Sequence, residues 1–196
     1  MIISQHVWLA FLWLGYGVVH SLLAAEKIKS FIKNISSSLH KYYRLLYSVF
    51  AAATLGGVLY YHIFISSIAL WNESSALKII AVLLALPALV IMIVSIKKYF
   101  FYLSGIDVLF KKQAAPLLQT NGLNKYMRHP LYTGTLLLVW CIFLYMPLLK
   151  NLIGCFCITA YTIAGAYFEE KKLLREFGDA YKNYAAKVPM LFPKFF

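Results

Sequence analysis

The residues best suited to chemistry lie in two short polar stretches of a largely apolar chain. The first is 128–134, Arg-His-Pro-Leu-Tyr-Thr-Gly, and the second, about 35 residues later, is the pair Glu169-Glu170. Pro130 suits the first turn of a helix, where its missing N–H costs nothing. The unpaired amides of that turn, with Arg128 and His129 beside them, favour an anionic group such as a carboxylate or a phosphate. The first stretch therefore predicts a helix that begins at an anion site.

The two glutamates are predicted to lie at the C-terminal end of an apolar helix, where the helix dipole does not favour negative charge. Lys171, Lys172 and Arg175 follow them and offer compensation. A ligand with hydroxyl donors or a positive charge is the other source. A single ligand with a carboxylate, a diol and a cationic centre would suit both stretches, and S-adenosylmethionine has all three.

Each of these side chains also has an ordinary role at a membrane surface. Arg128 suits an anchor that extends its charge to the headgroups, and His129 a residue at a helix entrance. Tyr126 and Tyr132 suit the aromatic belt at the membrane–water interface. These alternatives stay open as long as the residues are taken one at a time.

Composition indicates a membrane protein. The chain has 196 residues, of which 62% are hydrophobic and 13% charged, whereas a soluble domain has roughly 25% charged residues. The net charge of +12 could suggest nucleic acid, but the Lys and Arg residues flank apolar runs. That arrangement is typical of topology signals and lipid headgroup contacts. We therefore expect membrane lipids as partners and no nucleic acid. The three cysteines show no metal-ligand spacing, so we expect no metal site.

Five apolar runs are about as long as a membrane-spanning helix, which needs roughly 20 residues. They cover 6–25, 43–66, 77–103, 130–147 and 151–168, with a loop predicted at 34–38. The last two runs are close enough to form a tight helical hairpin. The predicted fold is an all-α membrane protein with a single domain, 1–196. Three spans fall in 1–103, and the polar stretches fall in the second half, 104–196.

Basic residues predict the orientation of the spans. The loop between the first two runs has five Lys or Arg residues, the segment after the third has six and the tail after the fifth has six, whereas the opposite side has only Lys78 and Lys150. An N-terminus outside and a C-terminus in the cytoplasm place all three basic segments inside. Both polar stretches then lie at the cytoplasmic end of the hairpin, and we expect a multi-pass protein of a bacterial inner membrane.

A longer pattern contains both polar stretches. The pattern R-H-P-x-Y-x-G, followed by E-E-x-x-L-x-x-x-F-G-x-x-Y-x-x-Y-x-x-x-V-P-x-x-x-P, runs from 128 to 193. It resembles the isoprenylcysteine carboxyl methyltransferase family of integral-membrane methyltransferases, which is related to the phospholipid methyltransferases. In the first half, 20–24 (His-Ser-Leu-Leu-Ala) and 43–47 (Tyr-Arg-Leu-Leu-Tyr) look like a bacterial branch that includes thiol S-methyltransferases.

The resemblance implies that S-adenosyl-L-methionine binds at the last two helices, without a Rossmann domain. The chain accordingly has no strand–G-x-G-x-x-G–helix unit. His129 and the first turn of its helix would hold the methionyl carboxylate, and Glu169 the hydroxyls or the ammonium group of the cofactor. The cofactor-binding residues implied by the match are Pro116, Leu117, Leu118, Gln119, Asn124, Tyr126, Arg128, His129, Pro130, Leu131, Tyr132, Glu169 and Glu170. At the position of Asn124 the eukaryotic enzymes usually have Tyr.

The expected reaction is methyl transfer to an apolar or lipid-like acceptor that enters from the bilayer. The eukaryotic enzymes have an Arg for the substrate carboxylate where this chain has Gly165. S-methylation of a small or hydrophobic thiol is therefore an alternative, and a non-enzymatic membrane accessory protein is a second. A thiol would need a base, for which His129 and His20 are candidates, and Arg44 is a candidate substrate-side residue.

Overall fold

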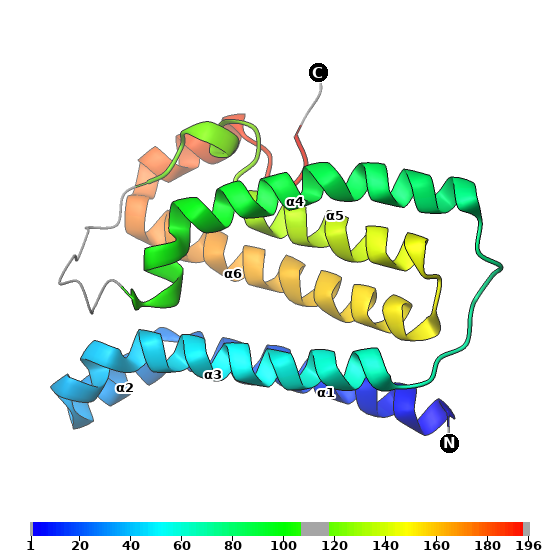
Figure 1. Cartoon of the computed structure of the whole chain (residues 1–196). Helices are drawn as coiled ribbons and strands as arrows, with labels where there is room; N and C mark the ends of the chain where they lie inside the picture. Colours follow the sequence, from blue (N-terminus) through cyan, green and yellow to red (C-terminus); the bar gives the residue numbers. More distant parts are fainter. Residues whose placement is uncertain (1, 107–117, 194–196) are drawn as a thin grey trace. The chain divides into compact units, whose positions relative to one another are not determined.

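The computed structural model describes residues 2–106 and 118–193. Within them the chain is helical, and its loops form one isolated antiparallel bridge, between Ala69 and Leu148. The helices, in chain order (Figure 1), are α1 (Ile2–Ala24), α2 (Glu26–Ile35), α3 (Ser37–Phe64), α4 (Ser75–Ser104), the 3-10 turn η2 (Gly122–Lys125), α5 (Pro130–Tyr145) and α6 (Leu149–Lys187).

Helices α1, α3, α4 and α6 are long and apolar enough to cross a membrane. Helix α5 is also apolar, but its 16 residues give a length of only about 24 Å, less than the roughly 30 Å of a hydrocarbon core. Large apolar side chains are exposed along the spanning helices, as expected for surfaces that face lipid. The predicted all-α membrane fold, with an apolar helix at each of the five runs, is confirmed. The orientation and the single domain stay predictions.

The chain divides into two compact units, and the first consists of 1–67 and 99–115. Polar side chains join α1 to α3 and to the segment that follows α3. His6 Nε2 lies 2.9 Å from Ser67 Oγ, and Trp13 Nε1 donates to His62 Nδ1 at 3.2 Å. The hydroxyl of Tyr47 lies 2.8 Å from His20 Nε2. These bonds satisfy polar groups that would otherwise be costly between apolar helices.

The predicted loop at 34–38 is wrong, because only Ser36 interrupts the helices there. Its backbone is extended, and its side chain accepts a hydrogen bond from the Leu39 amide at 3.2 Å. Ser36 is thus the N-cap of α3, and one capping residue is enough to end one helix and begin the next. The segment before it forms the separate helix α2, which was not predicted.

The second unit consists of 68–98 and 116–196, and contains the predicted hairpin of α5 and α6. The turn between these helices is held by Asn151, whose Nδ2 donates to the Met146 carbonyl at 2.8 Å. It is also paired with the loop before α4, because the Leu70 amide donates to the Pro147 carbonyl at 2.8 Å. On α5, a Cβ at Gly134 would lie 2.7 Å from Met92 Cγ, so this glycine permits close packing against α4.

Helix α6 is much longer than the predicted fifth span. We expected the helix to end at 168, which would put Glu169 and Glu170 at its C-terminus, but it continues to Lys187. That expectation is wrong because 171–177 contains good helix formers and neither Pro nor Gly, so the change from apolar to polar residues does not end the helix. The helix does bend at Gly178, where φ is +53° and ψ is −129°.

Candidate functional site

The centre of the candidate site is the carboxylate of Glu170, on α6 beyond its apolar part. Arg128, in the loop before α5, donates to both of its oxygens, from Nε at 2.9 Å and from Nη2 at 2.7 Å. The remaining Nη1 of Arg128 donates to the carbonyls of Ala185 and Val188. Both charged side chains are largely buried, with 19% of Glu170 and 12% of Arg128 exposed. All three guanidinium nitrogens therefore take part in joining the start of α5 to Glu170 and to the C-terminal end of α6.

His129 lies between the two glutamates. Its Nε2 is 2.7 Å from Glu170 Oε1 and its Nδ1 is 3.5 Å from Glu169 Oε2. Burial by itself lowers the pKa of His129, but the two carboxylates outweigh that effect and the pKa is raised. Because ionised carboxylates only accept hydrogen bonds, both ring nitrogens act as donors. His129 is thus held as an imidazolium.

Glu170 stays ionised in this environment. Burial alone raises the pKa of a carboxyl group, but hydrogen bonds from Arg128, Tyr181 and His129 more than offset it and lower the pKa of Glu170. The Tyr181 hydroxyl donates to Oε1 at 2.5 Å. Burial, and then the carboxylate beside it, raises the pKa of Tyr181, so the phenol stays protonated. The bend at Gly178 lies between Glu170 and Tyr181 on α6, and the positive φ of Gly178 is one that a glycine adopts readily.

Glu169 differs from Glu170 in its exposure. Its side chain is 45% exposed, whereas the His129 ring beside it is only 5% exposed. Partial burial raises the pKa of Glu169, but hydrogen bonds from His129 and Tyr132 outweigh it and the pKa is lowered. The ring of Tyr132 stacks on His129 at a centroid distance of 5.4 Å. Glu169 is therefore an ionised carboxylate that remains open to a ligand.

Gly165 lies one helical turn before Glu169 and leaves room at this point. A Cβ built on it would meet only the Tyr132 hydroxyl within 4 Å, at 3.9 Å. A methyl group there would make an ordinary van der Waals contact. The surface between Tyr132 and Glu169 is thus unobstructed on the side where the resemblance would place an arginine.

The loop before α5 is fixed by main-chain bonds to the segment after α6. The amides of Arg128 and His129 donate to the carbonyls of Pro189 and Met190 at 2.9 and 3.1 Å. The Thr133 hydroxyl donates to the Leu191 carbonyl at 2.6 Å. Segment 188–191 therefore holds the backbone that carries the two cationic side chains.

Asn124, in the turn η2, supports the same loop. Its side-chain oxygen accepts from Lys98 Nζ and its side-chain nitrogen donates to the Arg128 carbonyl, both at 3.1 Å. Its own carbonyl accepts from the Tyr184 hydroxyl at 2.6 Å. Only 5% of Asn124 is exposed, so these contacts position the loop from inside.

The model of the NnrU protein family matches residues 7–192. The chain belongs to the NnrU protein family. Because the match covers both units, the membership extends to the first half of the chain, where the sequence motifs are weaker.

Curated relatives of this NnrU-family chain are methanethiol S-methyltransferases. It is 39% identical over 80 residues to methanethiol S-methyltransferase 2 of Bradyrhizobium diazoefficiens, covering 40% of this chain and 29% of the relative. It is 35% identical over 86 residues to the methanethiol S-methyltransferase of Crocosphaera subtropica, covering 42% and 32%. With that of Pseudomonas deceptionensis it shares 32% over 105 residues, covering 47% and 38%. The matches thus span about a third of each relative's length. No solved structure matches the chain.

These similarities confirm the resemblance to a group of membrane methyltransferases that includes thiol S-methyltransferases. Within the second unit, the structure brings together Arg128, His129, Tyr132, Glu169 and Glu170, all of which were predicted for the cofactor site. The other residues predicted for the cofactor site in that unit lie outside this cluster of side chains. Pro130 and Leu131 form the first turn of α5. Tyr126 and Gln119 are exposed, and Leu118 is half-buried. Pro116 and Leu117 lie outside the described residues.

His20 and Arg44 lie in the first unit of this NnrU-family chain. The His20 ring is hydrogen-bonded to Tyr47. Arg44, on α3, packs against Gly105, where a Cβ would lie only 2.8 Å from the Arg44 carbonyl carbon. Their predicted roles on the substrate side stay predictions.

Three side chains that hold the site were not among the predicted residues: Tyr181, Tyr184 and Lys98. The two tyrosines occupy the fixed Tyr positions of the longer pattern, and that spacing could have pointed to them. Lys98 gives no such signal, because a lysine after an apolar run is what topology alone predicts.

Proposed function

We propose that this chain is an integral-membrane methyltransferase that uses S-adenosylmethionine and transfers its methyl group to a thiol. The observation that carries the proposal is Glu169, an exposed, ionised carboxylate held beside the buried imidazolium of His129. The naming of the relatives as methanethiol S-methyltransferases supports thiol over carboxyl methylation.

The side chains present fit the polar groups of S-adenosylmethionine. Glu169 would hold its hydroxyls or its ammonium group, because a carboxylate accepts from either. The amides of the first turn of α5 would face its carboxylate, because both ring nitrogens of His129 already donate to the two glutamates. Tyr132 would form one wall. When bound, the cofactor supplies an electrophilic methyl group on a sulfonium sulfur.

Arg128 and Glu170 have a different role in this proposal. All three guanidinium nitrogens of Arg128 are bonded within the protein, and Glu170 accepts four hydrogen bonds. We therefore assign both to positioning His129 and Glu169. Preorganised groups lower a barrier because they need no rearrangement as the reaction proceeds.

The charges at the site favour a thiol over a carboxylate acceptor. Arg128 and His129 are balanced by Glu169 and Glu170, so the cluster contributes no surplus cation. A desolvated carboxylate acceptor without a cationic partner is costly, and Gly165 provides none. A small thiol needs no such partner, and the space at Gly165 would admit its alkyl group.

A thiol must lose its proton as the new carbon–sulfur bond forms. His129 does not suit this task, because both of its nitrogens already donate to carboxylates. Since Glu169 is assigned to the cofactor, we propose that the thiol proton passes to water at this exposed edge of the site. We further propose that the site faces the cytoplasm of a bacterial inner membrane and that the acceptor enters from the bilayer.

Methyl transfer by the purified full-length chain tests the proposal. The protein is incubated with S-adenosylmethionine labelled on its methyl group and with either methanethiol, a longer alkanethiol or a prenylated cysteine. We expect labelled thioethers from the thiols. A labelled methyl ester from the prenylated cysteine alone would support carboxyl methylation instead, and failure of the protein to bind S-adenosylhomocysteine would favour the accessory-protein alternative.

A further inference from the structure

Helix α2 has a basic face and an apolar face. Lys27, Lys29 and Lys33 share one side of the helix with Glu26 and Ser30, and the apolar residues Ile28, Phe31, Ile32 and Ile35 occupy the other. The helix follows α1 after the single residue Ala25. A short amphipathic helix at the end of a spanning helix is the arrangement of segments that lie in the headgroup region of a bilayer.

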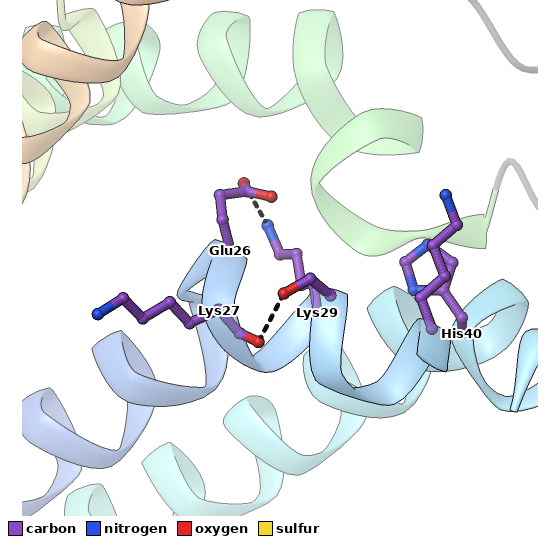
Figure 2. A pocket seen from close by; sticks show the side chains of 6 residues that line it. Glu26, Lys27, Lys29 and His40 are labelled. Carbon is purple, nitrogen blue, oxygen red and sulfur yellow. Dashed lines mark hydrogen bonds and ion pairs between the residues drawn. The ribbon is translucent and has the colours of Figure 1, made fainter. Parts of the chain in front are cut away.

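The basic face borders a surface hollow. It is lined by Glu26, Lys27, Lys29, Ser30 and Lys33 of α2 and by His40 of α3. Figure 2 shows Glu26 and Lys29 between His40 on one side and Lys27 on the other, with the Lys27 side chain extending away from His40. The hollow thus lies between two helices of the first unit.

The charge of the hollow is positive. Lys29 Nζ lies 3.1 Å from Glu26 Oε1, and this pair neutralises one lysine. For Lys27 and Lys33 the described part of the chain shows no carboxylate at ion-pair distance. His40 Nδ1 is buried without a hydrogen-bond partner there. Lys27 and Lys33 therefore leave the basic face of α2 positively charged, and a phosphate group accepts from ammonium donors.

The apolar side indicates the source of that phosphate. Phe31 is 62% exposed and Ile35 is 65% exposed, and Leu39 at the start of α3 is also exposed. A free phosphate ion has no apolar part that could contact this surface. A phospholipid places acyl chains directly beside its phosphate, and clusters of lysines next to a spanning helix attract anionic lipids.

We propose that the hollow between α2 and α3 binds the headgroup of an anionic phospholipid, whose phosphate is attracted by the unpaired charges of Lys27 and Lys33. Phe31 and Ile35 enter the adjacent acyl region. The site belongs to the first unit and is independent of the methyl-transfer proposal. It fixes α2 at the membrane surface.

Binding of short-chain lipids to the purified full-length chain in a neutral detergent tests this site. The probes are dioctanoyl phosphatidylglycerol, dioctanoyl phosphatidylcholine and inorganic phosphate. We expect the wild type to prefer phosphatidylglycerol. The double variant Lys27→Gln/Lys33→Gln should weaken that binding roughly 10- to 30-fold, because each lysine near an anionic surface contributes a factor of about five.

The matched control is Lys182→Gln/Lys187→Gln, which removes two exposed lysines from α6. It should bind phosphatidylglycerol like the wild type, and an equal loss in both double variants would overturn the site in favour of general basic charge. Phe31→Ala should weaken phosphatidylglycerol and leave phosphate unaffected. The lipid assignment is overturned if phosphatidylcholine binds as tightly as phosphatidylglycerol, or if inorganic phosphate binds as tightly and Phe31→Ala changes nothing.

Discussion

The two adjacent glutamates should respond in opposite ways to the same substitution. Glu170→Gln removes the charge that binds Arg128 through two bonds and also accepts from His129 and Tyr181. Breaking a buried pair by removing one partner costs 3–5 kcal/mol, because it leaves an uncompensated buried charge. Since 19% of Glu170 is exposed, we place the loss near the lower end, at about 3 kcal/mol.

Glu169→Gln is the matched control, with the same chemical change one residue earlier on α6. Its carboxylate is 45% exposed, and exposed ion pairs contribute about 0–1 kcal/mol. We therefore expect little change in stability but a large loss of S-adenosylhomocysteine binding. Glu170→Gln should instead unfold at a clearly lower temperature.

The assay combines thermal unfolding followed by circular dichroism with calorimetric binding of S-adenosylhomocysteine, both on protein purified in the same detergent. The reasoning is refuted if Glu169→Gln is the less stable variant. It is also refuted if Glu169→Gln binds the ligand as tightly as the wild type, because the exposed carboxylate would then have no part in the site.

Three further perturbations test other parts of the structure. The pKa of His129 is raised, so its stabilising contribution should be complete below its unfolded value of about 6.5 and fall as the pH rises through the folded value. His129→Gln should flatten this alkaline slope in a series of melting temperatures. Gly178→Ala forces a side chain onto φ +53° and should cost about 1–3 kcal/mol, measured by chemical denaturation. Gly165→Ala should keep thiol methylation, because its Cβ would lie 3.9 Å from Tyr132, whereas Gly165→Arg should abolish it; equal activity would show that this space is not used.

Much of the fold follows from hydropathy alone. The five apolar runs correspond to α1, α3, α4, α5 and α6, since the membrane demands long stretches of apolar residues whatever their detailed packing. Helix ends were less predictable. Serines at 36–38 have the composition of a loop, but one of them is a capping residue. Glu169 marks the end of the apolar part of α6 and not the end of the helix.

The site could be predicted as a set of residues but not as an arrangement. The pattern of Arg128, His129, Glu169 and Glu170 indicated that they act together. It did not reveal that Glu170 is paired with Arg128 and His129 whereas Glu169 stays exposed. The burial of two adjacent helix residues depends on the positions of neighbouring segments, which the sequence does not give. The main-chain bonds to Pro189 and Met190 could not be predicted as contacts, since a backbone carbonyl is available at any residue.

Those main-chain bonds have a consequence for biosynthesis. A chain is made from its N-terminus, and 188–191 follows all five apolar helices. The helices can enter the membrane before the loop at 128–129 has its partners. Insertion and completion of the polar cluster are therefore separate events in time, and a nascent chain that stops at Lys187 would be integrated while its Arg128 and His129 amides still lack the carbonyls that hold them.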